Sequence, residues 1–348
     1  MADLNDGRVD LRRSRGRFIA FGLVAALLFV ALGGRLFQLQ VVNGEVYASR
    51  VAADRTVEVP EPAPRGLIFD REGRPVAVNA PAWTVNVRPA DLPPAQRGRI
   101  LRRVAEITGA DARTLRNRLD AFQGSPYDLV PVKRGIGRTA ALLLGEEAQL
   151  LPGIVVQVAP VRQYLDDTGV VNGELLSQIL GYTGPVTRED WARLQDRGYL
   201  RDDPIGKAGV EASFEDELRG EYGARLLERD ASGRLLQVIE TIREPEPGTN
   251  LMLTVDARAQ RLATQALTWG MEVAGVSQGV VAVMNPQSGE ILALVSLPTY
   301  DNNKFATGIS AADFNVYLAD PDRPLRNHAI SDIYPPGSTY KLVTGIAA

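Results

Sequence analysis

Residues 334 to 341 of the chain are YPPGSTYK, a stretch that contains a serine and a lysine three positions apart. The prolines and the glycine exclude a helix before Ser338, whereas the following STYKLVTGIAA suits one, so the sequence predicts a helix that begins close to Ser338. Side chains three residues apart lie on the same face of a helix. We therefore expect the Lys341 amine to lie within reach of the Ser338 hydroxyl.

Ser338 and Lys341 are candidates for the nucleophile and the base of serine acyl transfer. Backbone N–H groups at the start of a helix favour a serine alkoxide and the oxyanion of an acyl intermediate. The chain has a single histidine, His328, and no cysteine, so a histidine-based triad or metal site is improbable and a cysteine nucleophile is excluded. Lysine can serve as the base where burial and a neighbouring cation lower its pKa. The alternative is a coincidental helix start, because a Ser-x-x-Lys pair also arises by chance in a chain of this length.

The residues before this motif predict the beginning of a catalytic domain. The segment 279 to 298, GVVAVMNPQSGEILALVSLP, has two apolar runs separated by a turn and indicates a β-hairpin. The runs are continuous more than alternating, which is typical of a sheet covered on both faces. Further upstream, NLMLTV predicts a strand, and Asp256 is placed to cap a long helix. Prolines and a glycine near residue 246 indicate a domain boundary.

The N-terminal sequence predicts a membrane anchor. Residues 18 to 34, FIAFGLVAALLFVALGG, carry no charge, and a transmembrane helix needs roughly 17 to 25 residues. Five arginines lie between residues 8 and 17, an excess typical of the cytoplasmic side. We expect a cytoplasmic tail over 1–17, a single-pass helix over 18–40 and a periplasmic remainder. A cleaved signal peptide with ALG as its cleavage site and a buried core helix are the alternatives.

The middle of the chain predicts a mixed α+β region. VEVPEPAPRG, residues 57 to 66, is expected to be an extended linker. GLIFDREGRPVAVN predicts a hairpin in which Gly73 adopts the left-handed conformation. RILRRVAEITG and RTLRNRLDAF have the spacing of amphipathic helices, whereas GIVVQVAPV is typical of a strand.

Two further patterns are interpreted as structural. Gly135, Gly137 and Ala140 have the outline of a dinucleotide fingerprint, but the next predicted strand offers no acid for a ribose, so no cofactor is expected. Residues 205 to 223, IGKAGVEASFEDELRGEYG, concentrate acidic residues, including Glu211, on one predicted helix. No histidine accompanies them, so we expect a solvated helix face and not a metal site. With 39 basic and 42 acidic residues, the chain lacks the excess of basic residues that is typical of nucleic-acid-binding proteins.

Several of these segments resemble one family. YPPGSTYK is similar to the nucleophile motif of class B penicillin-binding proteins. Its Tyr-Pro-Pro-Gly-Ser-Thr sequence most resembles that of the cell-elongation members, the penicillin-binding protein 2 type. PRGLIFDREGRPVAVN resembles the opening motif of the family's pedestal, or dimerisation, domain. PGIVVQVAPVRQY, LGYTGPV and IGKAGVEASFEDELRGEYG also resemble family segments, and the residues from 279 onward resemble the start of its transpeptidase domain. The resemblance covers nearly the whole chain.

The resemblance implies a fold and an activity. The fold would be a single N-terminal transmembrane helix, an α+β pedestal domain over 41–245, and the N-terminal part of an α/β/α transpeptidase domain with an antiparallel sheet over 246–348. Ser338 would be the acylated nucleophile and Lys341 its base, with the Ser338 N–H as half of the oxyanion hole. D-Ala-D-Ala of a peptidoglycan stem peptide would be cleaved, and an amine of a second stem peptide would accept the acyl group. β-Lactams would acylate the same serine.

The chain departs from the family pattern in two places. The family often has Asn-Arg-Ala and a glycine before Tyr-Pro-Pro, where this chain has Asn327-His328-Ala329 and Asp332. We expect His328 to be a supporting or surface residue and not a catalytic group. The family's Ser-x-Asn and Lys-Thr-Gly motifs do not occur after Ser338, so we expect the chain to be truncated and inactive by itself.

Two alternative functions are left open. One is the septal counterpart within class B. The other is a non-catalytic module, in which the anchor and the pedestal bind and regulate a polytopic glycan polymerase of the RodA type. The expected partners are peptidoglycan stem peptides, β-lactams, the membrane, a RodA-type polymerase and other elongation-complex proteins, without nucleic acid.

Overall fold

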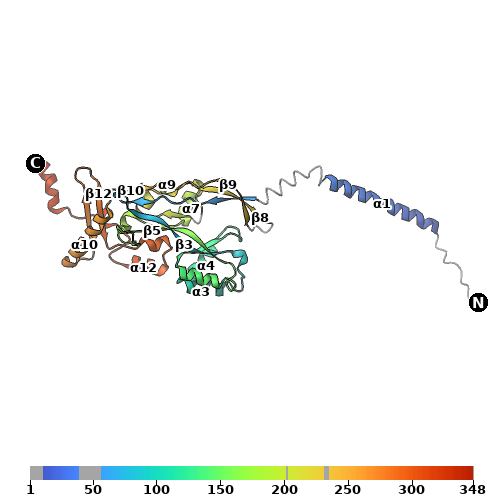
Figure 1. The fold of residues 1–348 in the computed structure, drawn as a ribbon, viewed down its shortest axis with the longest axis horizontal. Helices are drawn as coiled ribbons and strands as arrows, with labels where there is room; N and C mark the ends of the chain where they lie inside the picture. Colours follow the sequence, from blue (N-terminus) through green and yellow to red (C-terminus); the bar gives the residue numbers. More distant parts are fainter. Residues whose placement is uncertain (1–10, 39–55, 201–202, 231–234, 348) are drawn as a thin grey trace, which may run out of the picture. The chain divides into compact units, whose positions relative to one another are not determined.

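The computed structural model describes residues 11–38, 56–200, 203–230 and 235–347 (Figure 1). The chain divides into two compact units, one formed by residues 1–58 and 226–239 and the other by residues 59–225 and 240–348. The larger unit contains the residues of the candidate site.

The smaller unit contains the long N-terminal helix α1, Leu11–Phe37. Its apolar side chains from residue 21 onward are mostly exposed, with Phe21 and Phe29 each 76% exposed. The transmembrane helix predicted over 18–40 falls on α1, except for residues 39 and 40, which lie outside the described residues, as do residues 1–10 of the predicted cytoplasmic tail. Among the described residues, no helix combines the length and the apolar character that a bilayer crossing requires.

The larger unit is built on a five-stranded sheet with the order β10-β2-β3-β4, in which β5 also pairs with β3. Its strands are β2 Ile68–Phe69, β3 Pro75–Val87, β4 Val130–Ile136, β5 Ile154–Tyr164 and β10 Leu251–Met252. The predicted hairpin is confirmed by β2 and β3, and Gly73 in its turn has a φ of 76°. The Asp70 carboxylate accepts the N–H groups of Glu72 and Arg74, which fixes this turn.

Three helices form a core with the sheet. They are α3 Arg97–Thr108, α4 Ala112–Ala121 and α5 Arg138–Glu146. The amphipathic spacing predicted for α3 and α4 is confirmed, because Ile100, Val104 and Leu115 are buried against strand residues such as Val85 and Val132. Asp111 begins α4 by accepting the N–H groups of the first turn. The region is mixed α+β, as predicted.

The predicted linker at residues 57–66 is in part a strand, so that prediction was wrong. β1, Thr56–Glu61, belongs to a three-stranded sheet of order β1-β8-β9, with β8 Gly223–Arg229 and β9 Leu235–Arg243. β1 is an edge strand of this sheet, and edge strands tolerate a proline such as Pro60 because one side of the strand needs no ladder partner. The proline content therefore concealed the alternation of valines and glutamates.

The predicted solvated helix over 205–223 is also different in the structure. It is replaced by strand β7 Pro204–Gly206 and two short helices, α8 Gly209–Ser213 and α9 Glu215–Arg219. Glu211 is fully buried, with its two carboxylate oxygens 2.7 Å from Arg65 Nε and 2.6 Å from Arg162 Nε. Arg65 also pairs with Glu215 at 2.7 Å. These four residues form the Glu211 cluster, in which arginines distant in sequence make the burial of the carboxylate possible.

Shorter elements lie between the strands and helices of the larger unit. They are η2 Pro89–Asp91, α6 Ser177–Leu180, β6 Thr183–Pro185, α7 Arg188–Leu194 and η3 Gln195–Arg197. β6 pairs with β7 in a two-stranded antiparallel sheet. A capping box between Thr187 and Asp190 begins α7.

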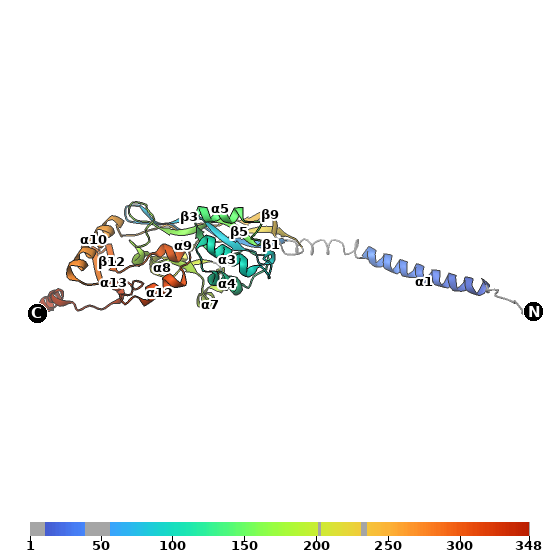
Figure 2. The same cartoon turned by 90° about the horizontal axis from the view of Figure 1, so that it is seen from below.

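The last part of the chain is a helix and a β-hairpin followed by short helices (Figure 2). They are α10 Ala257–Ala274, β11 Gly279–Met284, β12 Ile291–Leu297, α11 Asn302–Ala306, α12 Ala311–Ala319, α13 His328–Ser331, η4 Gly337–Tyr340 and α14 Lys341–Ala347. The predicted hairpin and the long helix capped by Asp256 are confirmed. Burial on both faces holds for β12 better than for β11, because the adjacent residues Val295 and Ser296 are both buried, whereas Val283 and Met284 are both exposed.

Candidate active site

Helix α10 and the β11–β12 hairpin form the platform on which the motif segment is built. The buried Gln260 side chain of α10 joins the two, donating to the Leu294 carbonyl at 2.9 Å and accepting the Leu294 N–H at 2.8 Å. An amide side chain thus pairs with β12 as a neighbouring strand would. The paired amide satisfies backbone groups that would otherwise be buried without a partner.

The start of α10 is tied to the β2–β3 turn by charged groups. Asp256 accepts the N–H groups of Arg258 and Ala259, and Arg74 Nη2 lies 2.8 Å from the Asp256 carboxylate and 2.7 Å from that of Asp70. Burial alone would raise the pKa of the Asp256 carboxyl, but the two N–H groups and the Arg74 guanidinium hold this pKa below its ordinary value. The capping carboxylate therefore stays ionised near neutral pH.

His328 is buried beside β12 and holds the segment that precedes the motif. Its backbone N–H donates to Ser296 Oγ at 2.9 Å. Its ring Nδ1 lies 2.6 Å from Asp332 Oδ2, and its Nε2 lies 3.0 Å from the carbonyl oxygen of Asp322. Both ring nitrogens face oxygen atoms, so the ring is held from two sides. His328 is thus a buried supporting residue and not a surface residue.

Asp332 completes this anchor. Its second oxygen lies 2.5 Å from Arg326 Nε, and Arg326 Nη2 donates to the Ser331 carbonyl at 2.7 Å. The hydrogen bond from His328 and the charge of Arg326 hold the pKa of the Asp332 carboxyl below its ordinary value, although partial desolvation opposes them. The two departures from the family pattern, His328 and Asp332, therefore contact each other. Their spacing of four residues is the sequence signal that could have predicted the pair.

The motif segment, residues 334–341, follows this anchor, and its described side chains, which include those of Ser338 and Lys341, are exposed. Gly337 has a φ of 55°, and the helical turn η4 begins there and continues into α14. The Lys341 N–H donates to the Ser338 carbonyl, so the two residues lie one turn apart, as the spacing predicts. Within the described part of the chain, both side chains are exposed, and no hydrogen bond or ion pair joins Ser338 Oγ to Lys341 Nζ. The structure brings the two backbones together but leaves the side chains unjoined.

The sequence did not reveal Gln260 as part of this platform. A glutamine on a helix is ordinarily solvated, and only the approach of β12 gives its amide two backbone partners. The sequence left open whether His328 is a supporting or a surface residue, and its burial depends on contacts with β12 and with the carbonyl of Asp322.

Two family models match the chain. Residues 60–253 match the penicillin-binding protein dimerisation domain, and residues 279–348 match the penicillin-binding protein transpeptidase domain. Because the first match alone covers more than half of the chain, the chain belongs to the penicillin-binding proteins. It has the fold of their dimerisation and transpeptidase domains. The domain limits predicted at residues 41, 245 and 246 stay predictions.

The curated relatives narrow this class. The chain is 31% identical over 348 residues to peptidoglycan D,D-transpeptidase MrdA of Escherichia coli K12, a match that covers 97% of this chain and 52% of the relative. MrdA of Acinetobacter baumannii is 32% identical over 340 residues, which cover 97% of this chain and 48% of the relative. The chain spans about half the length of these relatives.

A solved structure has the same fold. In the complex between penicillin-binding protein 2 and MreC from Helicobacter pylori, the matching chain has a TM-score of 0.67 and 26% identity, with 84% of this chain and 52% of that chain covered. The resemblance to the penicillin-binding protein 2 type is thereby confirmed.

Proposed function

We propose that this protein is a peptidoglycan D,D-transpeptidase of cell elongation, with Ser338 as its nucleophile and Lys341 as its base. The observation that carries the proposal is the helical turn at Gly337–Tyr340, which puts the two residues one turn apart inside the region that matches the transpeptidase domain. The names of the curated relatives support the same activity.

The proposed reaction has two acyl-transfer steps. Ser338 Oγ attacks the carbonyl carbon of the D-Ala-D-Ala peptide bond while Lys341 Nζ accepts the hydroxyl proton. The C–N bond then breaks, the departing D-Ala amine takes a proton, and an ester to Ser338 is left. An amine of a second stem peptide attacks this ester, a new peptide bond forms, and the serine hydroxyl is regenerated. The Ser338 N–H would donate to the oxyanion in both steps.

Labelling with fluorescent penicillin tests the assignment of Ser338. The β-lactam forms the same serine ester, so protein expressed from its complete reading frame should be labelled and the Ser338→Ala variant should not. Ser331→Ala is the matched control, because Ser331 is exposed seven residues earlier. Label that persists in Ser338→Ala would refute the assignment.

The proposal includes a membrane anchor over residues 18–40, with residues 1–17 cytoplasmic and the bulk of the chain periplasmic. It is supported by the uncharged run, the arginines before it and the exposed apolar side chains of α1. Alkaline phosphatase folds to an active form only outside the cytoplasm, so a fusion after residue 60 should be active. An inactive fusion would contradict the proposed orientation.

A non-catalytic role is the second candidate, favoured by the exposed and unjoined side chains of Ser338 and Lys341. The anchor and pedestal would then bind a RodA-type glycan polymerase, together with elongation proteins comparable to the MreC found with the solved relative. Co-purification of the polymerase should be equal for the wild type and Ser338→Ala. Absence of the polymerase from both preparations would refute this role, and its loss from the variant alone would tie binding to the catalytic serine.

A further inference from the structure

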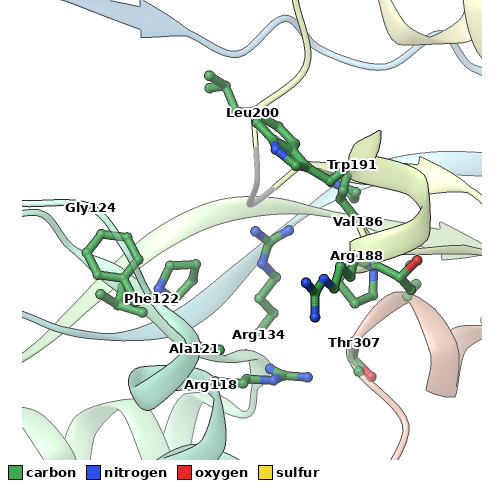
Figure 3. A pocket seen from close by; sticks show the side chains of 18 of the residues that line it. Arg118, Ala121, Phe122, Gly124, Arg134, Val186, Arg188, Trp191, Leu200 and Thr307 are labelled. Carbon is green, nitrogen blue, oxygen red and sulfur yellow. The ribbon is translucent and has the colours of Figure 1, made fainter. Parts of the chain in front are cut away.

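A cavity of about 1060 Å³ lies in the larger unit, away from the motif residues. It is lined by the end of α4, by β4, by the start of α7 and by the end of α11. Figure 3 shows three guanidinium groups directed into it, those of Arg118, Arg134 and Arg188. Among the described residues that line the cavity there is no aspartate or glutamate.

Arg118 carries a partly buried charge at this cavity. Arg118 is half-buried, and its Nη1 donates to the Val132 carbonyl at 2.8 Å. In the part of the chain that the structure describes, no carboxylate forms an ion pair with it. Burial and the charge of Arg134 lower the pKa of Arg118. Partly buried charges are ordinarily paired with an opposite charge, so Arg118, with the exposed Arg188 on the same cavity wall, is typical of a site that an anion completes.

The walls of the cavity add a second requirement. Phe122, Val186, Trp191 and Leu200 supply apolar and aromatic surface close to the guanidinium groups (Figure 3). An inorganic anion uses no such surface, and the volume is that of a site for a drug-sized molecule or a short peptide. Guanidinium groups bind carboxylates in a planar, two-point geometry.

We propose that this cavity binds an acidic segment of a protein partner. The carboxylates of the segment would pair with Arg118 and Arg188, and its apolar side chains would lie against Phe122 and Trp191. The site is separate from the proposed chemistry at Ser338, and no group of the acyl-transfer reaction takes part in it.

A nucleotide is the less suitable occupant, although Gly135 and Gly137 lie at a strand-to-helix junction. A Cβ on Gly135 would lie 2.5 Å from the Thr307 side chain, so this glycine, with a φ of 69°, is explained by close packing against the end of α11. A phosphate is not needed to account for it.

Fluorescence anisotropy on the full-length protein tests the proposal. The probe is a fluorescein-labelled nine-residue peptide that alternates glutamate and leucine, with the glutamine version of the same peptide as a control. We expect Arg118→Gln and Arg188→Gln each to weaken binding about tenfold. Arg116→Gln, on the exposed face of α4, should change it less than about twofold. Ser338→Ala should bind the probe as the wild type does, which separates this proposal from the catalytic one.

Three outcomes would overturn the proposal. Equal binding of the glutamine peptide would show that carboxylates are not required for binding. An unchanged affinity in Arg188→Gln would show that the peptide does not bind in this cavity. Arg188 is exposed, so its replacement tests the site without the Val132 contact that Arg118 supplies to the fold. Arg118-dependent binding of pyrophosphate or ATP, with no binding of the peptide, would make the cavity a phosphate site.

Discussion

The Glu211 cluster and the motif segment at residues 334–341 both use charged or reactive side chains, but they hold them in opposite ways. Glu211 is fully buried, and Arg65 and Arg162 bind its two oxygens at 2.7 and 2.6 Å. Ser338 and Lys341 are exposed, and only a backbone hydrogen bond relates them. Among the described residues, the charge of Glu211 has its partners in place. For Ser338 and Lys341 only the backbone is positioned.

The difference concerns what surrounds a charge. A carboxylate can leave water when cations replace its hydration, and the two arginines do so for Glu211. A lysine base requires the reverse condition, because it must lose its proton near neutral pH, and burial or a nearby cation favours that loss. The spacing of Ser338 and Lys341 positions the pair, and the surroundings must activate it.

Removal of the Glu211 charge should have the largest effect on stability. In Glu211→Gln, Arg162 is left buried without a charged partner, because Glu211 is its one salt-bridge partner among the described residues. Loss of one partner of a buried ion pair costs about 3–5 kcal/mol. Chemical denaturation of the full chain should show this decrease in the free energy of unfolding.

Glu217→Gln is the control for that experiment. Glu217 lies on α9, close to Glu211 in the sequence, but it is exposed. Its replacement should change the free energy of unfolding by less than about 0.5 kcal/mol. Equal effects of the two substitutions would mean that the buried cluster contributes no more than a surface charge.

Lys341→Met should have the next largest effect, this time on chemistry and not on stability. A positioned general base contributes about 10²–10⁴-fold to a rate, so acylation by fluorescent penicillin should slow by that factor. The melting temperature should stay within about 1 °C of the wild type, because Lys341 is exposed. A wild-type acylation rate in Lys341→Met would exclude this lysine as the base.

His328→Ala should have a smaller effect, on stability. The substitution removes the two ring contacts, to Asp332 and to the carbonyl of Asp322, and leaves a void beside β12. We expect a loss of about 1–3 kcal/mol in the free energy of unfolding. Ile330→Ala, on the same short helix and 73% exposed, is the control and should be close to neutral. A neutral His328→Ala would show that the anchor before the motif is not needed for stability.

Local features of the fold could be predicted from the sequence. The β2–β3 turn with Gly73, the amphipathic helices α3 and α4, and the Asp256 cap depend on neighbouring residues, and all of them are observed. The turn that carries Ser338 is of the same kind. Each is encoded within a few positions, so composition and spacing suffice to predict it.

Features that depend on distant residues could not be predicted. Glu211 meets Arg65 across 146 positions and Arg162 across 49, so its acidic surroundings in the sequence indicated a solvated face. β1 is a strand because β8 lies beside it. His328 is buried because β12 provides Ser296. In each case the tertiary neighbour determined the outcome, and a single sequence does not show which neighbour that is.

The smallest expected effect is a change in the pH dependence of the melting temperature on replacement of Asp332. This pH dependence should belong to the His328–Asp332 anchor and not to the motif segment. The pKa of Asp332 is held below its ordinary value chiefly by the His328 hydrogen bond, so the folded state favours the ionised carboxylate. The stabilisation is then present above the unfolded pKa of about 3.9 and is lost as the pH falls through the lower folded value. The difference in melting temperature between the wild type and Asp332→Asn should therefore be fully developed near pH 5 and shrink below about pH 4. The difference in melting temperature between the wild type and Lys341→Met should show no such acidic transition, because the described ion pairs of Asp332 are with Arg326 and His328 and not with Lys341. A difference in melting temperature that persists unchanged at pH 2 would show that Asp332 acts through the shape of its side chain and not through its charge.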